Sequence, residues 1–330
     1  MKKILLSLVA AIVATTATYA QSLIATLTHE GNITTYSGPS AFSQAHEAAE
    51  DGDIITLSSG SFNAVTITKG ITIRGAGMAV DPTTQSEPTI LTNNSTNYIT
   101  MKDGTTTRLT IEGVYFNNAL TISATLTGAT FLKSRFKSIN CSGAGKAENL
   151  TMIHCKVADG LSFTSSSTFS CLNCIIWEPT TTPGEFINCV VKKGSASYYL
   201  SNATFKNCIF VGCANSTFDN TNTFFNCVGL NAEQWNLFNS TNSTNQVLSD
   251  YSAIFKTCTD GTYSDSETFE LTTTAASTYK GTDGRQIGVY GGMMPFNPQP
   301  SNPQITNCTV AEKSDANGML SIDITVQGAQ

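Results

Sequence analysis

The sequence predicts an all-β solenoid, and its composition and one internal repeat carry that prediction. Only 13% of the 330 residues are charged, and Ser, Thr and Asn supply most of the polarity between short apolar alternations. Alternation with a period of two is typical of half-buried β-strands. Five cysteines recur in similar local strings at intervals of 19, 15, 19 and 19 residues. A nearly fixed period of this length indicates repeats that stack into one elongated core.

Residues 1–20 have the composition of a secretory signal peptide. A basic start at Lys2 and Lys3 precedes the apolar run from Ile4 to Val13. Small residues follow and end at Ala20, after which we expect cleavage. A membrane anchor would need an apolar run of about 20 residues, roughly twice the run present. We therefore expect a protein that is secreted, extracellular or held in the cell envelope, and that does not span the membrane.

The segment 21–53 is predicted to cap the solenoid at its N-terminal end. Residues 41–50 form a short amphipathic pattern that places Phe42 and Ala45 on one face of a helix. The alternating run that begins at Ile54 predicts the first strand of the solenoid.

Each repeat string has the order apolar, any residue, corner, small, any residue, apolar. Strict alternation would place its two apolar ends on opposite faces, so the chain must bend at the corner, where Asn tolerates left-handed backbone. The small position suits an inward-facing cysteine. The predicted structural ladder comprises Cys155, Cys174, Cys189, Cys208 and Cys227 with the corners Asn173, Asn188, Asn207 and Asn226. Because the period explains these cysteines as core residues, we expect them to be mostly reduced.

These features together resemble the pectin-lyase-like superfamily, particularly its secreted bacterial members with a degenerate Asn-Cys rung. The helix before Asp51-Gly52-Asp53-Ile54 resembles that family's cap and first strand. The glycine-rich string from Gly281 to Gly291 resembles its closing rung. The resemblance implies a right-handed single-stranded parallel β-helix over residues 54–292, with an N-terminal helical cap and roughly twelve rungs of about 20 residues. A leucine-rich repeat is the rival solenoid, but this repeat lacks its leucine spacing.

Residues 293–330 are predicted to form a Pro-rich link and a C-terminal β-hairpin appendage. Pro295, Pro298 and Pro300 interrupt the ladder because proline cannot donate a backbone hydrogen bond. Asn317-Gly318 lies between two alternating runs, which is a hairpin signal.

The composition and the resemblance together limit the function classes. A net charge of −6 with scattered Lys and Arg argues against nucleic acid as a partner. The superfamily implies polysaccharide lyases, pectin-type hydrolases, esterases and non-catalytic binders. A hydrolase needs converging carboxylates and a Ca²⁺-dependent lyase needs an acidic cluster, whereas the rungs hold only scattered acidic residues. No catalytic residue, metal site or cofactor is therefore predicted.

A basic group follows from the repeat register. The outward position after the cysteine place holds Arg135 and Lys156 on neighbouring rungs, and the position two residues later holds Lys137, Trp177 and Lys192. Cations beside an exposed indole would suit an acidic sugar. These five residues are the candidate ligand-binding site, and a solvated surface with chance clustering of charge is the alternative that stays open.

Two further motifs have chemical potential. His154 takes a corner that Asn fills elsewhere, either as a base or as a turn histidine bonded to backbone. Cys171-x-x-Cys174 has the spacing of a metal or redox pair. Both cysteines face inward by the register, so we interpret them as core residues.

The outward columns of the later rungs are apolar enough to need a cover, because patches of this size are unusual on monomers. One column comprises Leu132, Ile153, Leu172, Ile187, Lys206 and Phe225, and a parallel column comprises Ile175, Val190, Ile209 and Val228. The C-terminal hairpin is the predicted cover. The alternatives are the loop with Trp235, Leu237 and Phe238, or self-association through this apolar outer face.

These observations favour non-catalytic recognition of a polysaccharide or surface component. The first alternative is a polysaccharide lyase or glycoside hydrolase acting on an acidic glycan. The second is a structural or adhesive surface protein with a protein partner. Acidic residues gathered on one face would favour the enzyme, whereas an apolar stripe would favour the protein partner.

Overall fold

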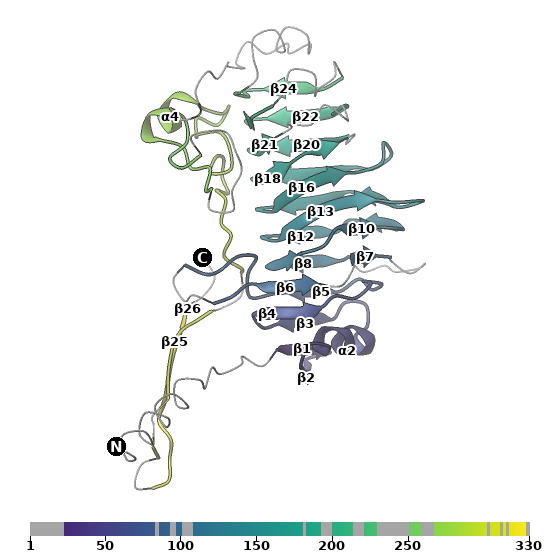
Figure 1. Cartoon of the computed structure of the whole chain (residues 1–330), viewed down its shortest axis with the longest axis vertical. Coiled ribbons are helices and arrows are strands. Elements are labelled where there is room, and N and C mark those ends of the chain that lie inside the picture. Colours follow the sequence, from purple (N-terminus) through teal and green to yellow (C-terminus); the bar gives the residue numbers. More distant parts are fainter. Residues whose placement is uncertain are drawn as a thin grey trace, which may run out of the picture.

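The computed structural model of the chain is a parallel β-solenoid of about seven turns, which confirms the predicted fold class (Figure 1). Strands account for 45% of it and helices for 6%. The structure describes residues 23–82, 86–92, 97–100, 108–180, 183–192, 200–213, 221–229, 251, 253–258, 267–301, 304–310, 313–314 and 317–327. The predicted signal peptide and the residues Trp235, Leu237 and Phe238 lie outside the described residues.

The first sheet begins with an antiparallel hairpin, β1 (Ile24–His29) and β2 (Asn32–Ser37). Strand β1 also pairs antiparallel with β3, and from β3 onward the sheet is a parallel ladder. Its order is β2-β1-β3-β5-β8-β12-β15-β17-β20-β22-β24. The ladder strands are β3 (Ile54–Leu57), β5 (Thr72–Arg74), β8 (Thr110–Glu112), β12 (Thr130–Leu132), β15 (Leu150–Ile153), β17 (Phe169–Leu172), β20 (Gly184–Ile187), β22 (Ala203–Lys206) and β24 (Thr223–Phe225).

The second sheet stacks in parallel along the order β23-β21-β18-β16-β13-β9-β6-β4. Its strands are β4 (Gly60–Asn63), β6 (Thr89–Thr92), β9 (Val114–Phe116), β13 (Arg135–Cys141), β16 (Lys156–Ser162), β18 (Ile175–Trp177), β21 (Val190–Lys192) and β23 (Ile209–Val211). Three shorter strands also pair in this sheet: β7 (Asn97–Ile99), β10 (Leu120–Ile122) and β19 (Pro179–Thr180). Strands β11 (Thr125–Thr127) and β14 (Lys146–Glu148) form a separate two-stranded sheet. The remaining elements are α2 (Ala41–Ala48), α4 (Thr273–Thr278), β25 (Gln304–Val310) and β26 (Ile322–Gln327).

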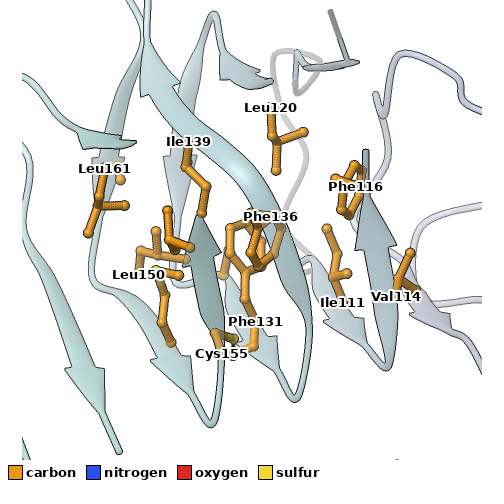
Figure 2. Close-up of a cluster of buried hydrophobic side chains, with 14 of the residues drawn as sticks. Ile111, Val114, Phe116, Leu120, Phe131, Phe136, Ile139, Leu150, Cys155 and Leu161 are labelled. Atoms are coloured by element: carbon orange, nitrogen blue, oxygen red, sulfur yellow. Dashed lines mark hydrogen bonds between the residues drawn. The ribbon is translucent and has the colours of Figure 1, made fainter. Parts of the chain in front are cut away.

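The core lies between the two sheets and is built from stacked apolar rows (Figure 2). The rings of Phe186 and Phe205 stack with centroids 4.8 Å apart, and those of Phe205 and Phe224 at 5.2 Å. At the N-terminal end, Phe42 and Ala45 of α2 are fully buried in the same core, so the helix closes the solenoid as its amphipathic pattern predicts.

The predicted corner bend is present in the backbone. Asn173, Asn188, Asn207 and Asn226 have φ values of 49°, 52°, 55° and 50°, and His154 has a φ of 54°. After each bend the small residue turns inward, and the five ladder cysteines are fully buried free thiols. Each ladder Sγ donates to the carbonyl oxygen two residues before it, at 3.2 to 3.4 Å. Ser134, at the same repeat position, donates to the Leu132 carbonyl oxygen at 2.8 Å.

The ladder is shorter than the twelve rungs predicted for residues 54–292. Among the described residues its last strand in the first sheet is β24, which ends at Phe225. The return segment, residues 267–301, instead runs back along the outside of the stack (Figure 1). Its glycines allow a close approach: a Cβ on Gly292 would lie 2.4 Å from Asn188 Nδ2. The string that resembles a closing rung therefore belongs to this segment.

The C-terminal hairpin forms as predicted but does not cover the solenoid. Strands β25 and β26 pair antiparallel with one register shift between Ile305 and Asn307. Ile322, Ile324 and Val326 are 55%, 51% and 55% exposed. The prediction that this hairpin covers the apolar outer face is therefore wrong.

Candidate functional site

One outward column of the second sheet changes character halfway along the stack. Its Cα partners in successive strands are Tyr115, Arg135, Lys156, Ile175, Val190, Ile209 and Val228. The first three are aromatic or cationic and the last four are aliphatic. The repeat register correctly placed this column on the outside of the stack.

The return segment and the residues before it cover the aliphatic half of this column. Ile175, Val190, Ile209 and Val228 are at most 2% exposed. They form a second apolar cluster, outside the solenoid core, with Ile254, Phe255, Cys258, Phe269, Leu271, Ala275, Ile287 and Val289 among others. This column is therefore covered within the chain. The other predicted apolar column is half-buried: Leu132, Ile153, Leu172, Ile187, Lys206 and Phe225.

The polar side chains at the solenoid corner hold the return segment in place. Asn173 Nδ2 donates to the carbonyl oxygens of Val289 and Gly291, both at 2.8 Å. His154 Nε2 lies 3.0 Å from the Met294 carbonyl oxygen. The corner residues therefore turn the chain at each bend and also dock the return segment.

Further along the stack, the end of the return segment reaches the earlier turns. The backbone N–H of Ser301 donates to Glu112 Oε1 at 2.8 Å. Lys133 Nζ, from the corner next to Glu112, donates to Ser301 Oγ at 3.3 Å. The segment thus follows the corner from the late turns to the early ones. Over the cationic half its Phe296 lies beside Lys156, and Arg135 and Lys156 stay half-buried.

The cationic half holds three of the five predicted site residues, which we call the cationic strip: Arg135, Lys137 and Lys156. Arg135 and Lys156 are Cα partners on β13 and β16. The Arg135 guanidinium carbon lies 4.3 Å from the centroid of the Tyr115 ring. Lys156 Nζ lies 6.0 Å from the centroid of the Phe296 ring. Each of these two cations is therefore placed beside an aromatic ring.

Lys137 is exposed where the pairing of β13 with β16 shifts register, between Phe136 and Ser138. A bulge of this kind re-aims a side chain relative to the regular column. Within the described part of the chain, Lys137 makes no ion pair.

The other two predicted site residues are drawn into the covered half. The Trp177 side chain is 5% exposed, and its ring centroid lies 5.5 Å from that of Phe269. Lys192, its Cα partner, places Nζ 5.5 Å from the indole centroid. The prediction of an exposed indole is wrong, because the return segment packs over it.

Two aromatic residues of the site were missed by sequence reasoning. Tyr115 precedes Arg135 in the same column, so the repeat string that begins at Ile111 contained the signal. Phe296 comes from the Pro-rich link, 140 positions after Lys156, and no local pattern predicts that contact.

The remaining candidate residues have structural environments. His154 is 7% exposed, and burial holds its pKa below the usual range against the opposing effect of its bond to Met294. Cys171 and Cys174 are fully buried in the core, and burial raises the pKa of the Cys171 thiol. The described residues contain no group of three His, Cys, Asp or Glu side chains that could hold a metal ion.

No protein-family model, curated protein or solved structure matches the chain. Within the described residues, no helix has the length and apolar character needed to cross a membrane.

Proposed function

We propose that the protein is a secreted or surface β-helix, related to the pectin-lyase-like superfamily, that recognises an acidic polysaccharide or surface glycan without turning it over. The observation that carries this proposal is the cationic strip, in which Lys137 is exposed and Arg135 and Lys156 are half-buried. Arg135, Lys137 and Lys156 lie on two adjacent strands, and aromatic rings flank the strip on both sides.

The strip has the chemistry that acidic sugars require. A guanidinium pairs with a carboxylate or sulfate through two parallel hydrogen bonds, while an ammonium acts as a mobile point charge. Stacking on Tyr115 limits the freedom of Arg135, so less conformational entropy is lost when an anion binds.

A polysaccharide lyase is the alternative for the same strip. It would use these cations to neutralise a uronate carboxylate and one of them, deprotonated, as the base. His154 does not favour this reaction, because its Nε2 is engaged by the Met294 carbonyl and its ring is buried.

The experiment measures binding of the wild-type protein to immobilised polygalacturonate, alginate and chondroitin sulfate. The test variant is Arg135→Ala/Lys137→Ala/Lys156→Ala. The matched control is Lys146→Ala/Lys206→Ala/Lys256→Ala, which removes the same charge from half-exposed or exposed ion pairs elsewhere. We expect the test variant to lose roughly 10- to 100-fold in affinity, from about 0.5 to 1 kcal/mol for each cation.

The control variant should bind like the wild type, and binding should weaken toward about 1 M salt as the Debye length shrinks to about 3 Å. Undiminished binding by the test variant would reject this site. Release of ultraviolet-absorbing unsaturated uronates from any bound glycan would show that the protein is a lyase and not a non-catalytic binder.

The secretion part of the proposal is supported by the composition of residues 1–20. N-terminal sequencing of the exported protein should begin at Gln21. An exported chain that still begins at Met1 would contradict cleavage after Ala20.

A further inference from the structure

Strand β2 is the outermost strand of the first sheet, at the N-terminal end of the stack (Figure 1). It pairs with β1 on one side, through the register that runs from Ile24–Ser37 to His29–Asn32. All of its residues except Tyr36 are exposed, and Ile33 is 69% exposed. Among the described residues, none pairs with the outer edge of β2.

The turn between β1 and β2 determines which backbone groups point outward. Glu30 and Gly31 both have positive φ, 48° and 81°, as a two-residue hairpin turn requires. His29 and Asn32 therefore form the first hydrogen-bonded pair, and such pairs alternate along an antiparallel ladder. Gly38 N donates to the Leu23 carbonyl at 2.8 Å, which fits this alternation.

It follows that Asn32, Thr34 and Tyr36 direct their backbone groups toward β1. The N–H and C=O groups of Ile33, Thr35 and Ser37 point to the outer edge. Among the described residues, no backbone partner is present at this edge for these three alternating residues.

This edge lacks the devices that usually protect sheets from edge-to-edge pairing. Natural edges carry charged side chains, proline or a bulge. The sequence from Asn32 to Ser37, NITTYS, contains no charge and no proline, and its pairing with β1 is free of register shifts. It is rich in the Thr, Ile and Tyr that favour strands.

We propose that β2 pairs antiparallel with β2 of a second copy of this chain. A two-fold axis perpendicular to the sheet leaves each side chain on the face that it already occupies. A residue can therefore pair only with itself or with a residue an even number of positions away. Placing the axis at Thr35 pairs Thr35 with Thr35, and Ile33 with Ser37, in the hydrogen-bonded positions. This arrangement joins all three outward residues of each copy through about six backbone hydrogen bonds.

A second copy satisfies this edge better than an unrelated strand does. The symmetric register places Thr34 beside Tyr36 in the close pairs and brings no charged side chain of β2 opposite another. The two first sheets become one continuous sheet, and the two solenoids extend away from the axis in opposite directions. The contact area is small, so the dimer is expected to be reversible rather than permanent.

The first test measures the mass of the whole protein by sedimentation and light scattering as its concentration rises to roughly 100 μM, a range that detects micromolar association. The wild type should approach twice the monomer mass. The edge variant Ile33→Lys/Thr35→Lys should stay monomeric, because paired lysines repel across the axis. The control Ser61→Lys/Asn63→Lys adds the same charge at exposed positions of β4 and should dimerise like the wild type. A wild type that stays monomeric, or an edge variant that dimerises equally, overturns the proposal.

The second test fixes the register by cross-linking under mild oxidation, with the wild type as the baseline. The two Thr35 Cα atoms should lie about 5.5 Å apart, within the range of a disulfide. The two Ser37 Cα atoms would be offset by about 14 Å along the strands. Thr35→Cys should therefore form a reducible covalent dimer and Ser37→Cys should not. Equal cross-linking of both variants, or of neither, contradicts the register.

Discussion

The two halves of one outward column on the second sheet differ in what lies over them. From Ile175 to Val228 the column is aliphatic and the residues around the return segment bury it. From Tyr115 to Lys156 the same register position carries an aromatic ring and two cations. The parallel pairing at this register position continues through both halves, so the difference lies in the side chains and in their cover.

This difference indicates how a uniform repeat acquires a local function. Where the return segment packs, the outward residue must be apolar, because burying a charge without a partner is costly. Where that segment runs along the corner instead, the outward residue is free to be polar. The cationic strip therefore occupies the part of the column where the outward residues are half-buried or exposed.

The largest expected effect comes from breaking the cover itself. Phe269 is 1% exposed and contacts both Trp177 and Phe255, with ring centroids 5.5 Å from each. Phe269→Ala should lower the free energy of unfolding by about 3–5 kcal/mol, because it leaves a cavity in the second cluster. Urea denaturation measures this loss, and dye binding reports the exposed apolar surface.

Met293→Ala is the matched control for Phe269→Ala, because Met293 is 75% exposed. It should leave stability within about 0.5 kcal/mol of the wild type. If Phe269→Ala is as stable as this control and binds no more dye, the return segment does not stabilise the fold by covering the aliphatic half of the column.

A smaller effect is expected at the corner that anchors the return segment. Asn173→Ala removes both side-chain bonds to the segment, each worth about 1 kcal/mol, and forces Ala into left-handed backbone at a cost of about 1–2 kcal/mol. Asn173→Gly removes the same bonds but tolerates the turn. Denaturation midpoints should rank wild type above Gly and Gly above Ala. A Gly variant as stable as the wild type would show that the two bonds do not anchor the segment.

The smallest expected effect is the pH dependence of stability that comes from His154, at the neighbouring corner. Burial and, to a lesser degree, Lys133 lower the pKa of His154, so the folded state favours the neutral ring. The unfolded chain takes up a proton below about pH 6.5, and stability should fall as the pH decreases from there toward the lower folded pKa. His154→Asn restores the usual corner residue and should flatten this dependence. Parallel stability curves for the two proteins between pH 7 and pH 5 would contradict the prediction.

His29 provides an internal comparison for that pH experiment. Its side chain bonds to Asp53 at 2.9 Å, which raises the pKa of the imidazole. A raised folded pKa stabilises the fold at low pH, and this stabilisation is lost as the pH rises through that pKa. The two histidines therefore act in opposite directions, and the His154→Asn difference isolates one of them.

The repeat fold could be predicted because its signals are local. The cysteine period and the Asn corners are read within six-residue strings, and the structure gives those corners positive φ values. The end of the ladder could not be predicted in the same way. The glycine-rich string near Gly288 contacts Asn207 through a backbone bond across 81 positions, and nothing local separates a docked segment from a rung.

The candidate site shows the same division between local and distant information. The register alone placed Arg135 beside Lys156 on the outside. It could not reveal that Trp177 is buried, because the covering Phe269 lies 92 positions away in a segment with no repeat. The repeat period therefore predicts which residues share an outward column. Whether that column is exposed depends on contacts with segments outside the repeat.

The most direct measurement of the central claim is lysine footprinting by acetylation and mass spectrometry, with and without a bound acidic oligosaccharide such as oligogalacturonate. If the cationic strip is the binding surface, the ligand should suppress the acetylation of Lys137 and Lys156. Lys146, Lys206 and Lys256, which lie away from the strip in ion pairs, should react equally in both samples. Protection at those three lysines, or unchanged reactivity at Lys137 and Lys156 in the bound protein, would contradict the account.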